Sequence, residues 1–255
     1  MANTVFDNKI IEAKAKDLLT TAINTRSLMT VDTDLAEDAG MTKVINTYTY
    51  TGEAEELGSG EGNSVRGAIS HVSNEYKVKR VQANFEYTDE DFMADNTVVD
   101  NGVAGATAIL KNKMNADFFA KCAEAEYSVT GDLSYDTIVD AISRLNVEDE
   151  SKIFVVIPND QKAALRKDPD YMAARMGEVV YTGQVGTVCG IPVVASRAAD
   201  VPYVMTPEAV KLFMKKDIEA EQDRDKDTCT NTVYVRSVYV CALVDQTKIC
   251  KIVKG

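Results

Sequence analysis

The amino-acid sequence predicts an α+β fold organised around one long central helix. Residues 97–126 carry apolar side chains at helical spacing, whereas residues 44–87 and 232–253 alternate in the manner of β-strands. Residues 133–200 have the pattern of strand, helix and strand, which indicates a small α/β subdomain. A chain of 255 residues is long enough to bury a sizeable core, and two subdomains fit it better than one.

The central helix is predicted from a stripe of residues spaced by three or four positions. About 30 residues at about 1.5 Å each would form a rod of about 45 Å. Because Gly102 and Gly105 are unfavourable inside a helix, either the helix starts after them or another backbone approaches closely. We expect a frayed or bent first turn. The stripe consists of Val99, Val103, Ala106, Leu110, Met114, Phe118, Cys122 and Ala125.

Residues 1–43 are predicted to form an N-terminal arm. Apolar residues recur at helical spacing between Ile10 and Ala22, and a polar segment rich in threonine and aspartate follows up to Gly40. A short amphipathic helix on a polar tether cannot bury its apolar face alone. The arm therefore needs a neighbour, in the same chain or in another one.

Residues 44–87 are predicted to form a long, twisted β-hairpin with a polar tip. VINTYTY at 44–50 alternates, and the acidic tip at 52–63 contains four glycines. In the second half of this segment, Tyr76 and Val78 follow one alternation of apolar residues, and Val81 and Phe85 follow an alternation shifted by one residue. Such a shift within a strand predicts a β-bulge. An isolated two-stranded hairpin is marginally stable in water. We expect it to lie on another structure, such as a second subunit.

The remaining elements are predicted from capping signals and short apolar runs. Thr88 and Asp91 form a capping box for a short helix before the central one. A helix at 134–146 precedes a buried strand at 152–158, and Asn159 caps a helix that ends before Pro169. Glycine turns divide 178–196 into a strand pair, Thr206-Pro207-Glu208 opens another helix, and strands occupy 232–245 and 247–253.

Composition and charge exclude several classes of protein. The net charge of −12 argues against a surface that grips nucleic-acid phosphates. No apolar run reaches the length of a membrane span, and the N-terminus lacks the core of a secretory signal, so we expect a cytoplasmic protein. The five cysteines include no C-x-x-C pair and are predicted to be reduced, mostly buried thiols: Cys122, Cys189, Cys229, Cys241 and Cys250.

The sequence nominates no catalytic, cofactor-binding or metal-binding residue. His71 is the only histidine and lies in a strand-like run. Gly183, Gly186 and Gly190 match no phosphate-binding loop and are predicted to be turn glycines. The acidic runs at 53–56 and 223–227 lack the spacing of a calcium loop and are predicted to be solvated. A small basic patch, which can pair with acids across an interface, consists of Lys77, Lys79 and Arg80. We therefore expect no enzyme.

The order of these elements resembles that of major capsid proteins of tailed bacteriophages with the HK97 fold. AEDAGMTKVINTYTYTGEAEELGSGE resembles the passage from the N-terminal arm into that family's E-loop, and NEYKVKRVQANFEYTDEDF resembles the exit from the loop into the spine helix. VGTVCGIPVVAS and VPYVMTPEAVKLFMKKDIEAEQDRD resemble the return from the axial to the peripheral domain. The likeness implies an arm at 1–43, an E-loop at 44–87, a peripheral domain at 88–132 and 222–255, and an axial domain at 133–221.

The resemblance also implies a function and partners. Copies of the chain would assemble as hexamers and pentamers into an icosahedral or prolate shell around double-stranded DNA, without sequence-specific binding. Because the arm starts near Met1, we expect a separate scaffolding protein, together with a portal and a decoration protein. Assembly is expected in the bacterial cytoplasm and the final location in the virion capsid. The alternatives are an encapsulin-type compartment around an enzyme cargo and a small-molecule enzyme on an unrelated α+β fold, which would show a deep pocket.

Overall fold

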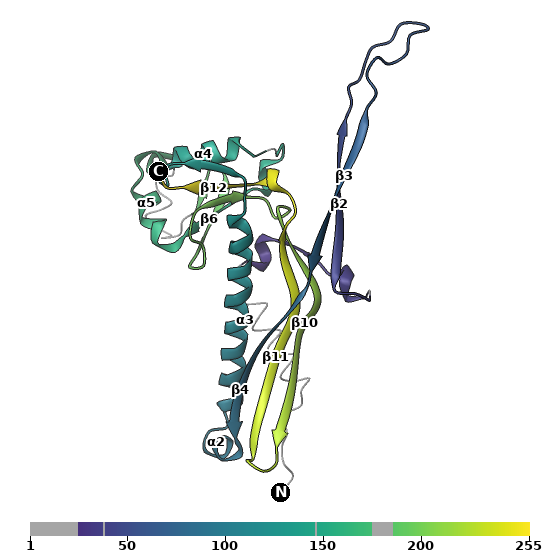
Figure 1. Cartoon of the computed structure of the whole chain (residues 1–255). Coiled ribbons are helices and arrows are strands. Elements are labelled where there is room, and N and C mark those ends of the chain that lie inside the picture. Colours follow the sequence, from purple (N-terminus) through teal and green to yellow (C-terminus); the bar gives the residue numbers. More distant parts are fainter. Residues whose placement is uncertain (1–24, 38, 146, 175–185) are drawn as a thin grey trace.

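The structure is a computed structural model that describes residues 25–37, 39–145, 147–174 and 186–255. Its longest helix, α3 (Val98–Ala123), runs lengthwise beside the strands β4, β10 and β11 (Figure 1). A second unit with α4, α5, β6 and β12 lies at one end of α3, and the hairpin of β2 and β3 projects away from the body (Figure 1). The predicted arm helix at 10–22 lies outside the described residues.

A four-stranded sheet extends along α3. Its order is β1 (Thr30–Asp32), β10 (Val210–Asp225), β11 (Thr230–Leu243) and β4 (Lys79–Thr88). The long strands β10 and β11 pair antiparallel from Val210↔Leu243 to Asp225↔Thr230, and β4 continues the sheet antiparallel to β11. The predicted strand at 232–245 is confirmed by β11.

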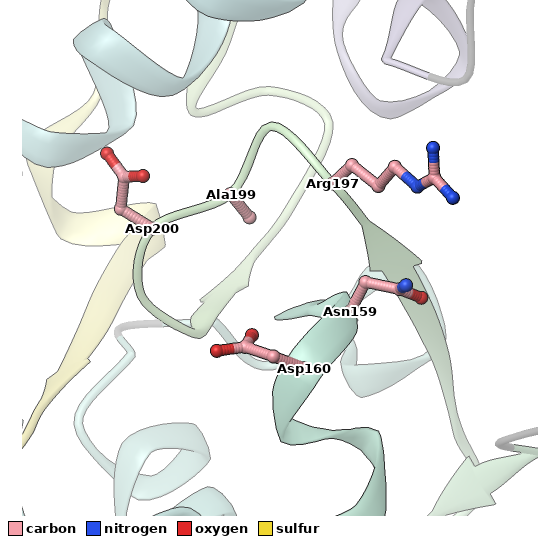
Figure 2. Close-up of a pocket in the computed structure, with 5 residues that line it drawn as sticks. All are labelled: Asn159, Asp160, Arg197, Ala199 and Asp200. Atoms are coloured by element: carbon pink, nitrogen blue, oxygen red, sulfur yellow. The ribbon is translucent and has the colours of Figure 1, made fainter.

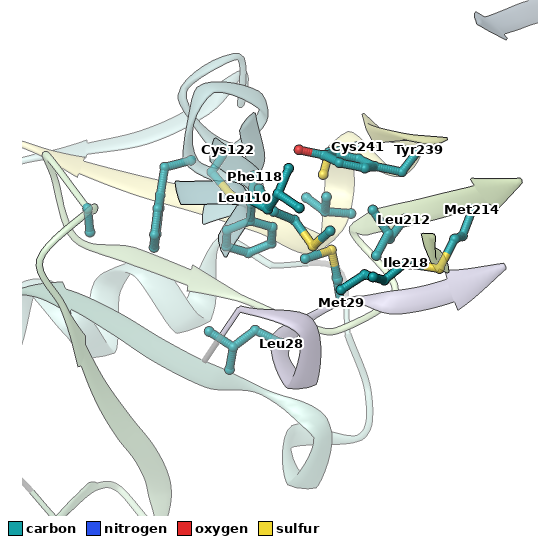
Figure 3. Close-up of a cluster of buried hydrophobic side chains, with 14 of the residues drawn as sticks. Leu28, Met29, Leu110, Phe118, Cys122, Leu212, Met214, Ile218, Tyr239 and Cys241 are labelled. Carbon is teal, nitrogen blue, oxygen red and sulfur yellow. The ribbon is translucent and has the colours of Figure 1, made fainter. Parts of the chain in front are cut away.

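The main core lies between α3 and this sheet. Every residue of the predicted helical stripe is buried, so the sequence pattern identified the inner face of α3. The opposing face of β11 is buried at every second residue, as expected of a strand with one covered face. Figure 3 shows side chains of this cluster, among them Leu110, Phe118, Leu212, Ile218 and Tyr239.

The start of α3 differs from the prediction. The helix includes both Gly102 and Gly105, so the expected frayed or bent first turn is wrong. A Cβ at Gly102 would lie 2.3 Å from the Phe85 ring of β4, which means that glycine lets this ring pack against the helix. A Cβ at Gly105 would meet no atom within 4 Å. Packing inside the chain therefore explains the glycine at position 102 and does not explain the glycine at position 105.

A six-stranded sheet forms the second unit. Its order is β5 (Tyr127–Thr130), β12 (Ile249–Val253), β9 (Tyr203–Met205), β6 (Phe154–Pro158), β8 (Ile191–Ser196) and β7 (Thr187–Val188). The helices α4 (Tyr135–Ser143), α5 (Lys162–Lys167) and α6 (Pro169–Ala174) belong to the same region. All five residues of β6 are buried, which confirms the predicted buried strand. The core of this second unit includes Ile138, Val155, Ile157 and Leu165.

The strand pair predicted at 178–196 is confirmed for its described part. β7 and β8 pair antiparallel across a turn at Cys189 and Gly190, both of which have positive φ. Gly186 directly precedes β7 and lies in no turn, and Gly183 lies outside the described residues. The turn interpretation is therefore confirmed for Gly190.

The projecting hairpin consists of β2 (Thr42–Thr51) and β3 (Ala68–Lys77). Its two strands form a separate two-stranded sheet. The predicted β-bulge is wrong, because the chain leaves one sheet at Val78 and enters another with β4. Val78 is buried at this junction, and its amide donates to the carbonyl of Met41 at 2.9 Å. The one-residue phase slip therefore marks a change of sheet.

Two predicted helix starts are also wrong, while the capping box is confirmed. Asn159 begins a 3₁₀ turn, and α5 follows at Lys162 without a side-chain cap. No helix follows Thr206; a turn from Thr206 to Ala209 leads into β10, because pairing with β11 and burial of alternate residues outweigh local helix propensity. α2 (Asp89–Ala94) begins with the predicted box between Thr88 and Asp91.

The sheets divide the chain differently from the expected segments. Residues 221 and 222 both lie inside β10, so a boundary there would cut one continuous strand. The C-terminal strand β12 pairs with β5 and β9 in the six-stranded sheet, away from β10 and β11. The chain thus crosses between the two sheets after β11.

Candidate assembly interface

The projecting hairpin exposes apolar side chains along most of its length. β2 and β3 pair over ten residues, from Thr42↔Lys77 to Thr51↔Ala68. Opposed residues share a face, so one face presents Tyr48 with His71 and Tyr50 with Ile69. The exposed fractions are 65% for Tyr48, 67% for Tyr50 and 72% for Ile69. We call Val44, Tyr48, Tyr50 and Ile69 the aromatic face of the hairpin.

The tip of the hairpin is held by specific contacts. Cβ atoms at Gly52 and Gly67 would lie 2.3 and 2.4 Å from the Tyr50 hydroxyl, so the phenol ring lies against both glycine backbones. The Glu55 carboxylate accepts hydrogen bonds from the Ser64 hydroxyl at 2.6 Å, the Ser64 amide at 2.7 Å and the Val65 amide at 3.0 Å. These bonds, the hydroxyl's first, lower the pKa of Glu55. The tip therefore has a conformation that these contacts define.

The base of the hairpin is anchored to the body. The rings of Tyr76 and Phe213 stack with centroids 5.4 Å apart, and the Tyr76 hydroxyl donates to the carbonyl of Leu243 at 3.4 Å. The Lys43 ammonium lies 2.7 Å from Asp34 and 3.8 Å from Asp32. These contacts fix the direction in which the hairpin projects. A fixed direction lowers the entropy that the hairpin would lose on binding a partner.

Charge is unevenly distributed along the hairpin. The tip at 52–67 contains four glutamates and one arginine. Lys77, Lys79 and Arg80, the predicted basic patch, are exposed where β3 passes into β4. The structure places the acidic run at 53–56 in the tip and the run at 223–227 at the turn between β10 and β11, where Asp225 accepts from the Asp227 amide at 2.9 Å.

A pocket in the six-stranded unit is the alternative location for chemistry. Asn159 and Asp160 line one side, and Arg197, Ala199 and Asp200 line the other, around about 400 Å³. Figure 2 shows the Arg197 side chain directed away from Asp160 and Asp200. In the described part of the chain, no three His, Cys, Asp or Glu side chains gather in a way that could hold a metal ion. The pocket residues do not converge on one point, so they give no support to the enzyme alternative.

Three of the five thiols are buried. Burial raises the pKa of Cys122, Cys241 and Cys250, and that of Cys241 reaches about 12. These three thiols are protonated at neutral pH and are poor nucleophiles. Cys189 and Cys229 are exposed, so the expectation of mostly buried thiols holds for three of five. His71 lies on the aromatic face with its ring 5.9 Å from that of Tyr48.

The sequence predicted that the hairpin lies on another structure, but it did not indicate the aromatic face. The alternation in VINTYTY predicted a strand, but it did not show that both faces of most of the hairpin are exposed. The signal was the placement of Tyr48 and Tyr50 on one side of a strand that has a single partner. In the part of the chain that the structure describes, no helix is long and apolar enough to cross a membrane.

The fold of this elongated subunit is similar to solved structures of phage capsids and of a virus-like particle. The fold is similar to the capsid of cyanophage P-SCSP1u, with a TM-score of 0.73, 12% identity and coverage of 92% of this chain and 88% of that one. It is also similar to a virus-like particle from Pyrococcus furiosus, with a TM-score of 0.65, 11% identity and coverage of 97% and 100%.

Sequence comparison identifies the family. A family model described as phage capsid protein matches residues 71–252, and the chain belongs to this family. The major capsid protein of Staphylococcus phage phiMR11 is 26% identical over 242 residues, which cover 90% of this chain and 86% of that protein. The family is a class of structural proteins and not of enzymes.

Proposed function

We propose that the chain is the major capsid protein of a tailed phage and assembles with copies of itself into a closed shell. The projecting hairpin is the observation that carries this proposal, because its aromatic face remains exposed in a single subunit. Membership of the phage capsid protein family agrees with it. We take the repeating units of the shell to be hexamers and pentamers.

The HK97-like parts can be assigned to the observed elements. The arm occupies 1–43, the E-loop corresponds to the hairpin of β2 and β3 within 44–87, and the spine is α3. The peripheral domain comprises α3 and the four-stranded sheet, and the axial domain comprises the six-stranded sheet with α4 to α6. On this assignment all of β10 belongs to the peripheral domain and β12 to the axial domain.

The acidic composition is compatible with a shell filled with double-stranded DNA. A net charge of −12 repels phosphates, so packaged DNA would not adhere to the inner wall. The chain would act in the virion capsid after assembly in the host cytoplasm. A separate scaffolding protein, a portal and a decoration protein are the partners that such a shell would use.

The test is negative-stain electron microscopy with light scattering on the full chain, expressed alone and with a candidate scaffolding protein. Closed shells, tubes or capsomers are the expected products. A well-behaved monomer or dimer under both conditions would overturn the proposal. The similarity to the Pyrococcus furiosus particle keeps a cellular compartment shell as the second candidate. Particles purified from the native source would contain DNA in the first case and a protein cargo in the second.

A further inference from the structure

The aromatic face of the hairpin carries the only histidine of the chain. His71 of β3 lies directly opposite Tyr48 of β2, and the centroids of the two rings are 5.9 Å apart. Both side chains are exposed, as is Ile69, two residues before the histidine on the same face. Within the part of the chain that the structure describes, the imidazole is therefore set among apolar side chains that remain uncovered.

Few charged groups share this face with His71. Residues two apart on a strand point to the same side, so the pairing of β2 and β3 identifies the neighbours of the imidazole. The nearest charged residues of the tip in sequence are Glu53 and Arg66, beyond the last paired residues. The titratable or charged side chains on the side of His71 are Tyr48 and Tyr50 on β2 and Glu75 and Lys77 on β3.

A change of pH in the neutral range acts on the hairpin through His71. Histidine is the only side chain that ordinarily changes its charge between about pH 5 and pH 8, and the chain has one. The tip keeps its conformation over this interval, because the pKa of Glu55 is lowered from 4.5 and the carboxylate still accepts its hydrogen bonds. Mild acidification therefore adds a positive charge to the aromatic face and leaves the rest of the hairpin unchanged.

A positive charge on this face opposes its burial. In a free subunit the imidazolium is hydrated, whereas burial among Tyr48, Tyr50 and Ile69 would remove this water, which costs far more for a charged ring than for a neutral one. Attraction between the imidazolium and the Tyr48 ring does not reverse the effect, because these rings are neighbours within the hairpin before and after assembly. Burial therefore selects the neutral imidazole.

We propose that His71 makes assembly sensitive to pH: the neutral imidazole is buried when the aromatic face contacts a second copy of the chain, and its protonation weakens that contact. This inference rests on the proposed function, which supplies the second copy, and it gives one residue of the face a regulatory role. Free subunits bind the proton and assembled ones do not, so the association constant decreases as the pH falls.

Light scattering measures the effect as a critical concentration, which is the lowest concentration of the full chain that gives shells, tubes or capsomers. Assembly is started from free subunits at each pH. Histidine side chains ordinarily titrate near about pH 6.5, so the contact weakens about tenfold at one pH unit below this value. We expect a critical concentration about tenfold higher at pH 5.5 than at pH 7.5. An equal value at both, or a lower value at pH 5.5, would overturn the proposal.

Two substitutions at position 71 remove the titration in opposite senses. His71→Phe keeps a planar ring without charge, so its critical concentration should be the same at both pH values and close to that of the unmodified chain at pH 7.5. His71→Lys carries a positive charge at both pH values and should resemble the unmodified chain at pH 5.5. A dependence on pH that persists in His71→Phe would contradict the role of the imidazole.

A matched control moves the histidine to the other face of the hairpin. In the variant with His71→Gln and Ser70→His, the number of histidines is unchanged. The new histidine lies opposite Thr49, on the side away from Tyr48, at a position that is also exposed. We expect the critical concentration of this variant to be independent of pH. The same tenfold change as in the unmodified chain would overturn the assignment to the aromatic face.

These outcomes are distinguishable from unfolding and from failure of the proposed function. Unfolding at pH 5.5 would appear equally in the unmodified chain and in His71→Phe, and circular dichroism of both measures it. If the unmodified chain forms no shells, tubes or capsomers at pH 7.5, the proposed function itself fails. If it forms them equally well at pH 7.5 and at pH 5.5, only the role of His71 fails.

Discussion

Tyr239 of β11 donates a hydrogen bond of 3.1 Å from its hydroxyl to the Asp117 carboxylate of α3. Burial raises the pKa of Tyr239, so the phenol remains a donor throughout the neutral range. Asp117 also accepts from the Lys113 ammonium at 2.7 Å. This polar contact borders the apolar layer between helix and sheet and fixes their relative position.

Loss of this hydrogen bond is expected to weaken the native state modestly. Tyr239→Phe keeps the buried ring, so we expect a decrease in the free energy of unfolding of about 1 kcal/mol, measured by urea denaturation of the unassembled chain. Tyr234→Phe, on the half-buried opposite face of β11, is the matched control and should change stability by less than about 0.5 kcal/mol. Equal changes in both variants would contradict a specific role for the bond.

Buried thiols are expected to make the chain sensitive to alkaline pH. Burial raises the pKa of Cys122 and Cys241 above the ordinary value of 9.0. Below pH 9.0 both states keep the proton, whereas above it the unfolded chain releases protons that the native chain retains. Stability should therefore be level up to about pH 9 and decrease above it, through the pKa of about 12 of Cys241. Urea denaturation from pH 7 to pH 11 measures this.

A triple variant tests the assignment to thiols. Removal of all three buried thiols, by Cys122→Ala, Cys241→Ala and Cys250→Ala, should move the onset of the alkaline decrease about one pH unit higher. There the phenols of Tyr203 and Tyr239, ordinarily 10.0, ionise in the unfolded chain. Only the pH at which the decrease begins is compared, because the substitutions also remove buried atoms and so lower the stability at every pH. An unchanged onset would assign the alkaline transition to other groups.

Glu55 is expected to order the hairpin tip. Its folded pKa is lowered from 4.5, so the hydrogen bonds to Ser64 and Val65 are present above that value and are lost as pH falls through the folded pKa. Glu55→Gln, or acidification, should lower the protection factors of the Ser64 and Val65 amides, which are the observed exchange rates corrected for the intrinsic rate at each pH. Glu56→Gln removes one charge from the same tip and is the control. Faster exchange in both variants would show that charge, rather than the Glu55 contacts, orders the tip.

The sequence predicted best the elements whose signals are local. The stripe on α3 repeats with a period that only a helix satisfies, and the capping box at Thr88 involves residues three positions apart. The alternation in β11 similarly follows from one covered face. In each case the physical cause lies within a short window of sequence.

The errors arose where distant residues decide the conformation. Residues 208–221 are rich in helix formers, yet they form β10 because Leu212 opposes Cys241 and Ala220 opposes Val235 in β11. The phase slip near Val78 has the same local pattern as a bulge, and only the partner of β4, more than 140 positions along the chain, shows that it is a change of sheet. The sequence predicted that the hairpin lies on another structure, but it could not locate the aromatic face, since exposure of Tyr48 depends on whether a distant part of the chain packs against that face.

Removal of the hairpin tip is expected to abolish shell completion without unfolding the chain. Deleting residues 52–63 joins Thr51 to Ser64 and leaves Ser64 to Gly67 as a four-residue turn, which is a length that hairpins accept. Almost all side chains of the deleted segment are exposed, so circular dichroism and the apparent Tm should stay close to those of the unmodified chain.

Electron microscopy of this variant should show capsomers or open sheets and no closed shells. A second variant, in which residues 52–63 are replaced by the same number of glycines and serines, separates the length of the hairpin from its chemistry. If length alone matters, this variant restores shells; if the glutamates and the Glu55 contacts matter, it does not. Normal particles from the deletion itself would show that the tip lies outside the contact, and assembly would then depend on the aromatic face at Tyr48 and Ile69 without its acidic extension.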